Sequence, residues 1–366
     1  MTHSRRKFLQ YTAVMGASAF ASPLAGIAMP WQQRKLGVAL VGLGGYATNQ
    51  LAPALQQTQN IELRGIVTGT PSKIPVWVEK YKIQDKNIYN YENFDKIIDN
   101  KDIDVVYIVL PNSMHAEYTI RAAKAGKHVI CEKPMAVSVK EGQSMIDACK
   151  KANRQLAIGY RLHYDPFHLE MMRLTREKVF GKVKLVEASD GFRAGDPNQW
   201  RLKHALSGGG PLMDVGIYAI QGARYTVGEE PIYVTAQEFP KTEPDKFKDV
   251  EESLAWQLYF PSGAIANSFS TYTTGVNRLY AAAEGGWYEV NNAYGYRGQQ
   301  GRTSKGPMEI TPINQQAAHM DGVAKAILEN RPNNVPGEEG LRDMKVIEGI
   351  YEAISTGKKV KLELLK

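Results

Sequence analysis

The first half of the chain alternates short, continuously apolar runs with amphipathic segments. The apolar runs lie between Leu36 and Arg161 and read LGVALVG, ELRGIVT, VVYIVLP, HVICEKP and QLAIGYR. Helical patterns such as AEYTIRAAKAG and SVKEGQSMIDACKKAN separate them. Strands that are apolar along their whole length are typical of a parallel sheet with helices on both faces. We therefore expect an α/β, doubly wound domain of the Rossmann type over residues 36–157.

The pattern changes after a helical segment near residues 165–181. Long β-type runs then follow one another with few helices between them: KVKLVEASDG, IYVTAQEF, ESLAWQLYFP, AIANSFSTYTT and RLYAAAEG. Strands without crossover helices predict a large, mostly antiparallel sheet. Two helices, around Gln315–Glu329 and Glu338–Thr356, complete an α+β domain that we expect to bind substrate and to oligomerise, over residues 158–366. At 366 residues the chain exceeds what one core usually organises, which favours two domains.

The N-terminus predicts where the protein works. Residues 1–28 contain SRRKFL followed by an Ala/Gly-rich apolar stretch, and a linker at 29–35 comes next. Paired arginines before such a stretch resemble a twin-arginine export signal, with small-residue cleavage options after Ala21 or Ala28. A short buried helix is the alternative. Because that export machinery carries folded proteins, we expect a periplasmic protein whose cofactor can be loaded before export.

Composition excludes several classes of protein. Hydrophobic residues make up 43% of the chain and charged residues 23%, and after the N-terminus no apolar run is long enough to span a membrane. Three of the cations behind the net charge of +7 lie in the export signal, and no dense Lys/Arg block interleaved with aromatics follows, so we expect no nucleic-acid partner. Cys131 and Cys149 cannot form a disulfide framework and lack the CxxC spacing of a metal site.

A glycine-rich turn follows the first strand directly. LGVALV runs into GLGGYA, which fits the GxGxxA pattern in its strand–turn–helix setting. Gly42 permits the tight turn, Gly44 lets the backbone approach a pyrophosphate, and the small Ala47 allows close helix packing. The helix N-terminus then faces the phosphates. We predict a dinucleotide site here; a tight turn without a ligand is the alternative.

The end of the second strand indicates which dinucleotide binds. NAD-binding domains usually place an acid there for the ribose 2′-hydroxyl, whereas this chain has Thr68-Gly69-Thr70. Thr68 can hydrogen-bond a 2′-phosphate and Lys73 can supply its countercharge, so NADP is favoured over NAD. An ordinary surface lysine at 73 is the alternative.

Two further segments carry residues that can do chemistry. HVIC delivers Lys133 at its carboxyl end, the edge where ligands bind in open α/β sheets, and Pro134 restricts the backbone before it. SGGGPLMDVGIY places Asp214 and Tyr218 at i and i+4 on a helix with Pro211 in its first turn. A carboxylate and a phenol on one face suit proton transfer at a sugar hydroxyl, and the Lys133 ammonium would favour the phenolate. Without Lys133, a surface Asp and a core Tyr would be equally good interpretations.

Together these segments resemble a known family. EKP, GYRLHYDP, QWRL and GGGPLMDVGIY are similar to the family named for glucose-fructose oxidoreductase, inositol dehydrogenase and MocA, over essentially the whole chain. LPNSMHAEY, KHVICEKPMA and PGEEG resemble its glucose-fructose oxidoreductase branch. The resemblance implies that Lys133, Asp214 and Tyr218 are catalytic. It implies cofactor contacts from Gly42, Leu43, Gly44, Gly45, Tyr46, Ala47, Thr68, Lys73, Tyr91, Leu110, His115, Glu132, Lys133, Arg161, Trp200, Arg201 and Tyr296.

The resemblance implies an NADP-dependent sugar oxidoreductase with a tightly bound cofactor. Hydride would pass between an aldose, or a related polyol or carbonyl substrate, and the nicotinamide, in a ping-pong cycle. An NAD-dependent glycosidase that oxidises its sugar transiently is one alternative, although its glycine-rich run carries a histidine that Gly208–Gly210 lacks. A non-catalytic sugar-binding protein is another.

The resemblance also bears on assembly and on the sugar pocket. We expect a homo-oligomer, a dimer or a tetramer, although the short linker lacks the long arm that clasps a neighbouring subunit's cofactor in this branch. No metal is expected, because His115, His163 and His319 lie on different elements without ligand spacing. Candidate pocket-lining residues are Tyr160, Arg161, His163, Tyr164, Asn198 and Lys203.

Overall fold

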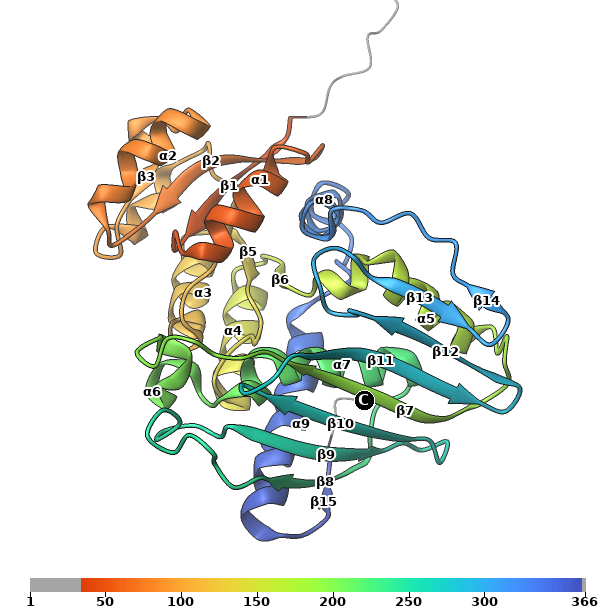
Figure 1. Ribbon diagram of the computed structural model, residues 1–366. Coiled ribbons are helices and arrows are strands. Elements are labelled where there is room, and N and C mark those ends of the chain that lie inside the picture. Colours follow the sequence, from red (N-terminus) through yellow and green to blue (C-terminus); the bar gives the residue numbers. More distant parts are fainter. Residues whose placement is uncertain (1–33, 364–366) are drawn as a thin grey trace, which may run out of the picture. The chain divides into compact units, whose positions relative to one another are not determined.

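The computed structural model describes residues 34–363. Residues 35–363 belong to one compact unit that contains two sheets (Figure 1). The expected export signal at 1–28 and most of the expected linker at 29–35 lie outside the described residues, so both stay predictions. Among the described residues, no helix has the length and apolar character needed to cross a membrane.

The first sheet has six parallel strands in the order β3-β2-β1-β4-β5-β6. They are β1 (Leu36–Val41), β2 (Ile61–Val67), β3 (Ile88–Tyr89), β4 (Val105–Ile108), β5 (His128–Cys131) and β6 (Leu156–Ile158). This is the doubly wound order, in which the strand sequence reverses beside β1 and leaves a crevice at the carboxyl ends of β1 and β4. The predicted parallel sheet is confirmed.

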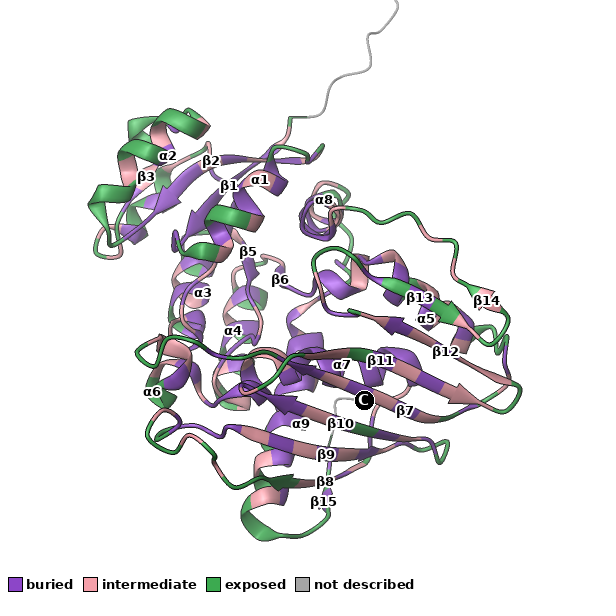
Figure 2. Cartoon of the chain, viewed as in Figure 1, coloured by how far each residue is buried: buried purple, intermediate pink, exposed green. Residues whose placement is uncertain are grey.

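Helices and short helical turns connect these strands. They are η1 (Ala47–Leu51), α1 (Ala52–Leu55), η2 (Pro71–Lys73), α2 (Ile74–Tyr81), η3 (Asp85–Asn87), η4 (Phe94–Asp99), η5 (Asn112–Met114), α3 (His115–Lys124) and α4 (Val139–Lys151). The strands are almost wholly buried (Figure 2), as their apolar runs predict. Helix α4 begins where Ser138 Oγ accepts a hydrogen bond from the Glu141 amide, 3.2 Å away.

The second sheet has nine strands in the order β14-β13-β12-β11-β7-β10-β9-β8-β15. They are β7 (Val183–Gly191), β8 (Tyr233–Glu238), β9 (Ser253–Tyr259), β10 (Ile265–Thr271), β11 (Val276–Ala283), β12 (Gly286–Asn291), β13 (Gln300–Thr303), β14 (Gly306–Pro307) and β15 (Val360–Lys361). Neighbours are antiparallel except β7 and β10, which are parallel. The prediction of a mostly antiparallel sheet is confirmed.

One face of the second sheet packs against helices. The remaining helical elements are η6 (Arg161–Tyr164), α5 (Pro166–Arg176), η7 (Trp200–Leu202), α6 (His204–Ser207), η8 (Leu212–Gly216), α7 (Ile217–Val227), α8 (Gln315–Leu328) and α9 (Gly337–Thr356). Burial alternates along β9, as expected for a strand with one covered face (Figure 2). Every residue of α7 is buried, so this helix lies inside the domain between the sheet and its neighbours.

Three local features differ from the sequence prediction. The edge strand β3 was not predicted, because two residues are too few to show a periodic pattern. Strands β12 to β15 extend the second sheet beyond the five predicted runs. The helix expected after Pro211 opens with a π-helical segment, η8, before continuing as α7. That wider turn carries Asp214, and π-helical segments are frequent at functional sites.

Candidate active site

The glycine-rich turn has the geometry that the sequence predicts. Gly42 has φ +92°, and a Cβ atom there would lie 2.5 Å from the carbonyl oxygen of Val109, so the turn requires glycine. A Cβ on Gly44 would meet no protein atom within 4 Å. Gly44 and Gly45 are exposed and Ala47 is buried. Because no neighbour explains a glycine at 44, the open space beside it fits a pyrophosphate that lies against the backbone.

The end of β2 lies beside this turn. Lys73 Nζ donates a hydrogen bond to the carbonyl oxygen of Leu43, 2.8 Å away, so the lysine reaches the glycine-rich turn. Thr68 is buried, and its Oγ1 accepts from the Thr70 amide at 3.1 Å. A Cβ on Gly69 would lie 2.7 Å from the Tyr91 ring, so glycine lets the ring approach the backbone. The structure thus gathers the predicted contacts for the adenosine end of a dinucleotide.

His115 contacts the backbone that follows strands β4 and β5. Its ring nitrogens are 2.8 Å from the carbonyl oxygen of Pro134 and 2.9 Å from that of Leu110. Burial lowers the pKa of His115 to about 4, so the ring is neutral and donates to only one of these carbonyls. The residue supports the backbone that carries Lys133, and a direct contact with a nucleotide stays a prediction.

Lys133, Asp214 and Tyr218 meet in the structure. Lys133 Nζ lies 2.5 Å from the backbone carbonyl oxygen of Asp214, 3.5 Å from its Oδ1 and 4.5 Å from the centre of the Tyr218 ring. Asp214 Oδ2 is 3.0 Å from Arg201 Nε and accepts a hydrogen bond from the Tyr272 hydroxyl at 3.1 Å. The three residues predicted to be catalytic therefore form one group at the carboxyl end of β5.

The charges of this group are fixed by its neighbours. Burial opposes the charged form of Lys133, but its electrostatic interactions with the Tyr218 side chain and with the carboxylates of Asp214 and Glu132 outweigh burial and raise its pKa. Burial likewise opposes ionisation of Asp214, and the cations Lys133 and Arg201 outweigh it and lower its pKa. At neutral pH Lys133 is therefore an ammonium and Asp214 a carboxylate.

Glu132 precedes the lysine and is itself buried. Its Oε1 accepts a hydrogen bond from the Tyr107 hydroxyl at 2.7 Å, and its Oε2 accepts from the Lys133 amide at 3.2 Å. Burial raises the pKa of Glu132, against the hydrogen bond from Tyr107 and the charge of Lys133. A Cβ on Gly159 would lie 2.6 Å from Oε1, so the glycine of the GYR motif makes room for this carboxyl group.

Arg161 is a second cation that packs against the Tyr218 ring. Its guanidinium lies 4.8 Å from the centre of the Tyr218 ring and 4.7 Å from that of Tyr296. It donates to the carbonyl oxygen of Tyr294 at 2.5 Å and to the side-chain oxygen of Gln315. Because the Arg161 guanidinium packs against both rings, it restricts the orientation of the Tyr218 ring.

Two further contacts involve predicted cofactor-binding residues, and the first joins the site to the glycine-rich turn. The ring of Tyr296 is 5.9 Å from that of Tyr46, which belongs to the turn. The guanidinium of Arg201 lies 4.6 Å from the Trp200 ring while it pairs with Asp214. The residues implied by the family resemblance therefore lie around one site, apart from His115, which lies behind it.

Sequence reasoning missed Asp190 and Tyr272. Asp190 ends the buried face of β7, where burial raises its pKa to about 7 against the charges of Lys133 and Arg161. In β7 the side chains of Val186, Ala188 and Asp190 point to the same buried face. An acid at a position where the alternation predicts an apolar residue could have indicated Asp190 from the sequence. Tyr272 follows β10, and the packing of β10 against η8 brings it to Asp214, so no local sequence pattern indicates its role.

The histidines considered as metal ligands, His115, His163 and His319, contact other groups in the described part of the chain. Within residues 34–363, no group of three or more His, Cys, Asp or Glu side chains could hold a metal ion. His163 Nε2 is 3.9 Å from Glu339, and its ring lies 4.2 Å from the Tyr225 ring. His319 is buried, with Nε2 3.0 Å from the carbonyl oxygen of Ile158. Both histidines therefore make packing contacts with neighbouring rings.

His319 leads to a stability prediction. Burial lowers its pKa to about 4, from about 6.5 in the unfolded chain, so the native protein resists a proton that the unfolded chain binds as the pH falls between these values. This group therefore removes about 2–3 kcal/mol of stability between about pH 7.5 and about pH 4.5. The His319→Gln variant lacks this loss. The difference in free energy of unfolding between wild type and variant should therefore become smaller by the same amount as the pH falls from about 7.5 to about 4.5. Denaturant unfolding at both pH values measures it, with the exposed His204→Gln as control; a cost independent of pH would contradict the prediction.

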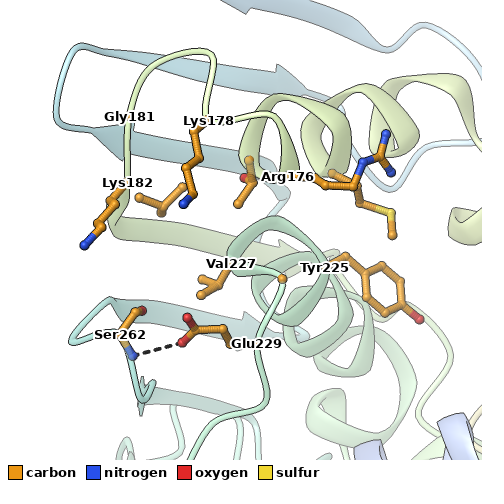
Figure 3. A pocket seen from close by; sticks show the side chains of 12 residues that line it. Arg176, Lys178, Gly181, Lys182, Tyr225, Val227, Glu229 and Ser262 are labelled. Atoms are coloured by element: carbon orange, nitrogen blue, oxygen red, sulfur yellow. Dashed lines mark hydrogen bonds between the residues drawn. The ribbon is translucent and has the colours of Figure 1, made fainter.

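A cavity of about 540 Å³ lies at the opposite end of α7 (Figure 3). It is bordered by the ends of α5 and α7 and the start of β7, and Glu229 accepts a hydrogen bond from the Ser262 amide there at 3.0 Å. Its lining includes Arg176, Lys178 and Lys182 but none of the predicted site residues. This cavity is therefore separate from the group around Lys133.

Family models match both parts of the chain. The model described as an oxidoreductase family with an NAD-binding Rossmann fold matches residues 36–160, and the GFO/IDH/MocA C-terminal domain matches residues 168–291. The chain therefore belongs to the Gfo/Idh/MocA oxidoreductase family. The predicted family and the predicted class, an NAD(P)-dependent oxidoreductase, are both confirmed.

Several relatives are similar over most of their length. The structure of aldose-aldose oxidoreductase from Caulobacter crescentus, complexed with glycerol, is 46% identical, covers 90% of this chain and 100% of its own, and has a TM-score of 0.88. D-xylose 1-dehydrogenase [NADP(+)] of Haloarcula marismortui is 27% identical over 89% of this chain and 92% of its own. The structure of levoglucosan dehydrogenase with NADH and levoglucosan, 22% identical with a TM-score of 0.78, shows the shared fold.

Proposed function

We propose that this protein is an NADP-dependent aldose oxidoreductase that retains its cofactor throughout the catalytic cycle. The observation that carries the proposal is the contact of the Lys133 ammonium with both Asp214 and the Tyr218 ring, at the strand end where this fold binds its ligands. The similarity to an aldose-aldose oxidoreductase supports an aldose as hydride donor and a second aldose as acceptor.

The residues at the glycine-rich turn support NADP as the cofactor. The space beside Gly44 fits the pyrophosphate, and no acid follows β2 to bind a ribose 2′-hydroxyl. Thr68 and Lys73 stand there instead, and they suit a 2′-phosphate. The similarity to an NADP-dependent D-xylose dehydrogenase agrees with this choice.

Lys73→Ala tests the cofactor preference. Loss of a charged hydrogen-bond donor to the 2′-phosphate should weaken NADPH binding about tenfold and leave NADH binding within about twofold. Nucleotide fluorescence titration of protein freed of its nucleotide measures both affinities. Lys80, which lies further along the chain in α2, provides the control. Lys80→Ala should change neither the NADPH nor the NADH affinity. Equal weakening for both nucleotides would contradict a 2′-phosphate contact.

The side chains around Lys133 suit oxidation of a carbinol and reduction of a carbonyl. When bound, NADP supplies the hydride acceptor and NADPH the donor. The Lys133 ammonium polarises the substrate oxygen. Tyr218 accepts the hydroxyl proton from that oxygen during oxidation and returns a proton to it during reduction. Asp214 keeps the ammonium in place, and it is itself oriented by Arg201 and Tyr272. Arg161 holds the Tyr218 ring in place through its guanidinium, which lies 4.8 Å from the ring centre.

The two-sugar cycle can be tested on the protein as purified. Because a soluble NADP pool is not expected in the periplasm, a retained cofactor has to be reduced by one sugar and reoxidised by the next. With D-xylose or D-glucose as donor and a second aldose as acceptor, initial rates should give parallel lines in double-reciprocal plots without added nucleotide. Mass spectrometry of the released nucleotide should show NADP or NADPH. Intersecting lines that require added nucleotide would contradict a retained cofactor.

We further propose export by the twin-arginine route. The support is the SRRKFL segment, which lies outside the described residues. Replacement of Arg5 and Arg6 by lysine should leave the folded enzyme in the cytoplasm and remove it from the periplasmic fraction. Arg34→Lys, beyond the predicted cleavage sites, is the control. Unchanged periplasmic activity in the double-lysine variant would contradict the proposal.

A further inference from the structure

Asp190 is a buried carboxyl group that the reaction described above does not use. It is 7% exposed and ends the face of β7 that packs against α7. Throughout residues 34–363, no hydrogen bond or ion pair joins its carboxyl group to another side chain; the charges of Lys133 and Arg161 and a hydrogen bond from the Gly191 amide favour its charged form. A buried carboxylate without such partners is costly, so its presence calls for a ligand or a proton-transfer role.

Strand β7 contacts both η8, which carries Asp214, and α7, which carries Tyr218, so Asp190 lies near the catalytic group and interacts electrostatically with charged groups of several elements. Lys133 follows β5, Arg161 lies in η6, Asp214 lies in η8 and Tyr294 follows β12. Burial raises the pKa of Asp190 to about 7, against the two cations and with the help of the Asp214 charge. Near neutral pH both its protonated and its ionised forms are therefore populated, unlike Asp214, which stays ionised.

The proposed acceptor sugar needs a second proton-transfer group. A cyclic aldose is a hemiacetal and has no carbonyl group to reduce. To open the ring, the O1 hydroxyl must lose its proton, the bond between C1 and the ring oxygen must break, and the ring oxygen must gain a proton. Lys133 and Tyr218 handle the proton on O1, so an acid is required on the other side of C1.

We propose that Asp190 is the acid–base group that opens and closes the aldose ring, which gives the enzyme an intrinsic aldose mutarotase activity. In opening, Asp190 donates its proton to the ring oxygen while Tyr218 accepts the O1 proton, C1–O breaks and C1=O1 forms. Closure reverses these transfers, so atoms and charges balance without a co-reactant. The inference rests on the proposed function, because it places a sugar C1 beside Lys133.

Polarimetry tests this activity without following redox chemistry. Freshly dissolved α-D-glucopyranose or α-D-xylopyranose is added to the enzyme as purified, and the approach to anomeric equilibrium is recorded. The wild-type protein should raise the rate at least about tenfold over buffer, and Asp190→Asn should lose most of that increase. Glu187→Gln removes a carboxylate from the same strand where it pairs with Arg278 outside the site, and it should match wild type. No acceleration of either sugar by wild type overturns the inference, whether or not any variant folds.

A choice of acceptors separates ring opening from general substrate binding. D-Glyceraldehyde has too short a chain to form a pyranose, whereas D-glucose must open before it is reduced. Asp190→Asn should slow reduction of D-glucose by the reduced enzyme at least about tenfold more than reduction of D-glyceraldehyde. Equal slowing of both would overturn the ring-opening role while leaving the aldose oxidoreductase intact. Failure of wild type to reduce either acceptor would overturn the proposed function and this inference with it.

Discussion

Lys133→Met is expected to lower turnover about a thousandfold or more while the protein stays folded. The ammonium contacts both Asp214 and the Tyr218 ring, and removal of a charged group that stabilises the reacting oxygen costs about this much. The fold should survive, because Asp214 keeps its partner Arg201 at 3.0 Å and is not left as an unpaired buried charge. Single-turnover reduction of the bound nucleotide by an aldose measures the effect.

Lys151→Met is the matched control for this substitution. Lys151 is an exposed residue at the end of α4, and its replacement should leave turnover within about twofold. Circular dichroism and thermal unfolding should show the same fold in both variants. A folded Lys133→Met variant with turnover within about tenfold of wild type would contradict the assigned role.

Tyr218→Phe is expected to lower kcat about a hundredfold to ten-thousandfold with a small change in the affinity for the sugar. The substitution removes only the hydroxyl group, since the phenyl ring can keep its contacts with Lys133 and Arg161 at 4.5 Å and 4.8 Å. Steady-state kinetics with saturating acceptor separate kcat from KM.

Tyr225→Phe provides the comparison on the same helix. Tyr225 lies two turns further along α7, is buried, and its hydroxyl group has no hydrogen-bond partner among the described residues. Its loss should therefore change kcat by less than about threefold. If the two variants lose activity equally, the effect arises from packing of α7, and Tyr218 does not transfer the proton.

The glycine-rich turn and the catalytic group could be predicted because their signals are local. Gly42 and Gly44 follow a strand directly, and Lys133 stands at the end of another, where the doubly wound fold places its ligands. That Lys133 meets Tyr218 was predicted from the family resemblance and from the rule about strand ends, whereas the hydrogen bond from Lys133 to the carbonyl oxygen of Asp214, 81 residues away, was not predicted. The structure adds the distances and shows the cations that keep Asp214 ionised.

The parts that could not be predicted depend on contacts between distant segments. The π-helical segment that carries Asp214 has no signature in residues 212–216, and β3 is too short to show one. Tyr272 reaches Asp214 because β10 packs against η8, a contact between segments far apart in the sequence. Asp190 could have been noticed in the apolar register of its strand, but its closeness to Lys133 and Arg161 requires the folded chain.

The near-ultraviolet absorbance of reduced nicotinamide, recorded on the protein as purified without added nucleotide, tests whether the Lys133–Tyr218 group faces a resident cofactor. An aldose should raise this absorbance by no more than one equivalent per chain, and a second aldose should then reverse it. If no member of a broad aldose panel changes the absorbance, the Lys133, Asp214 and Tyr218 group does not transfer hydride from sugars and the account is wrong.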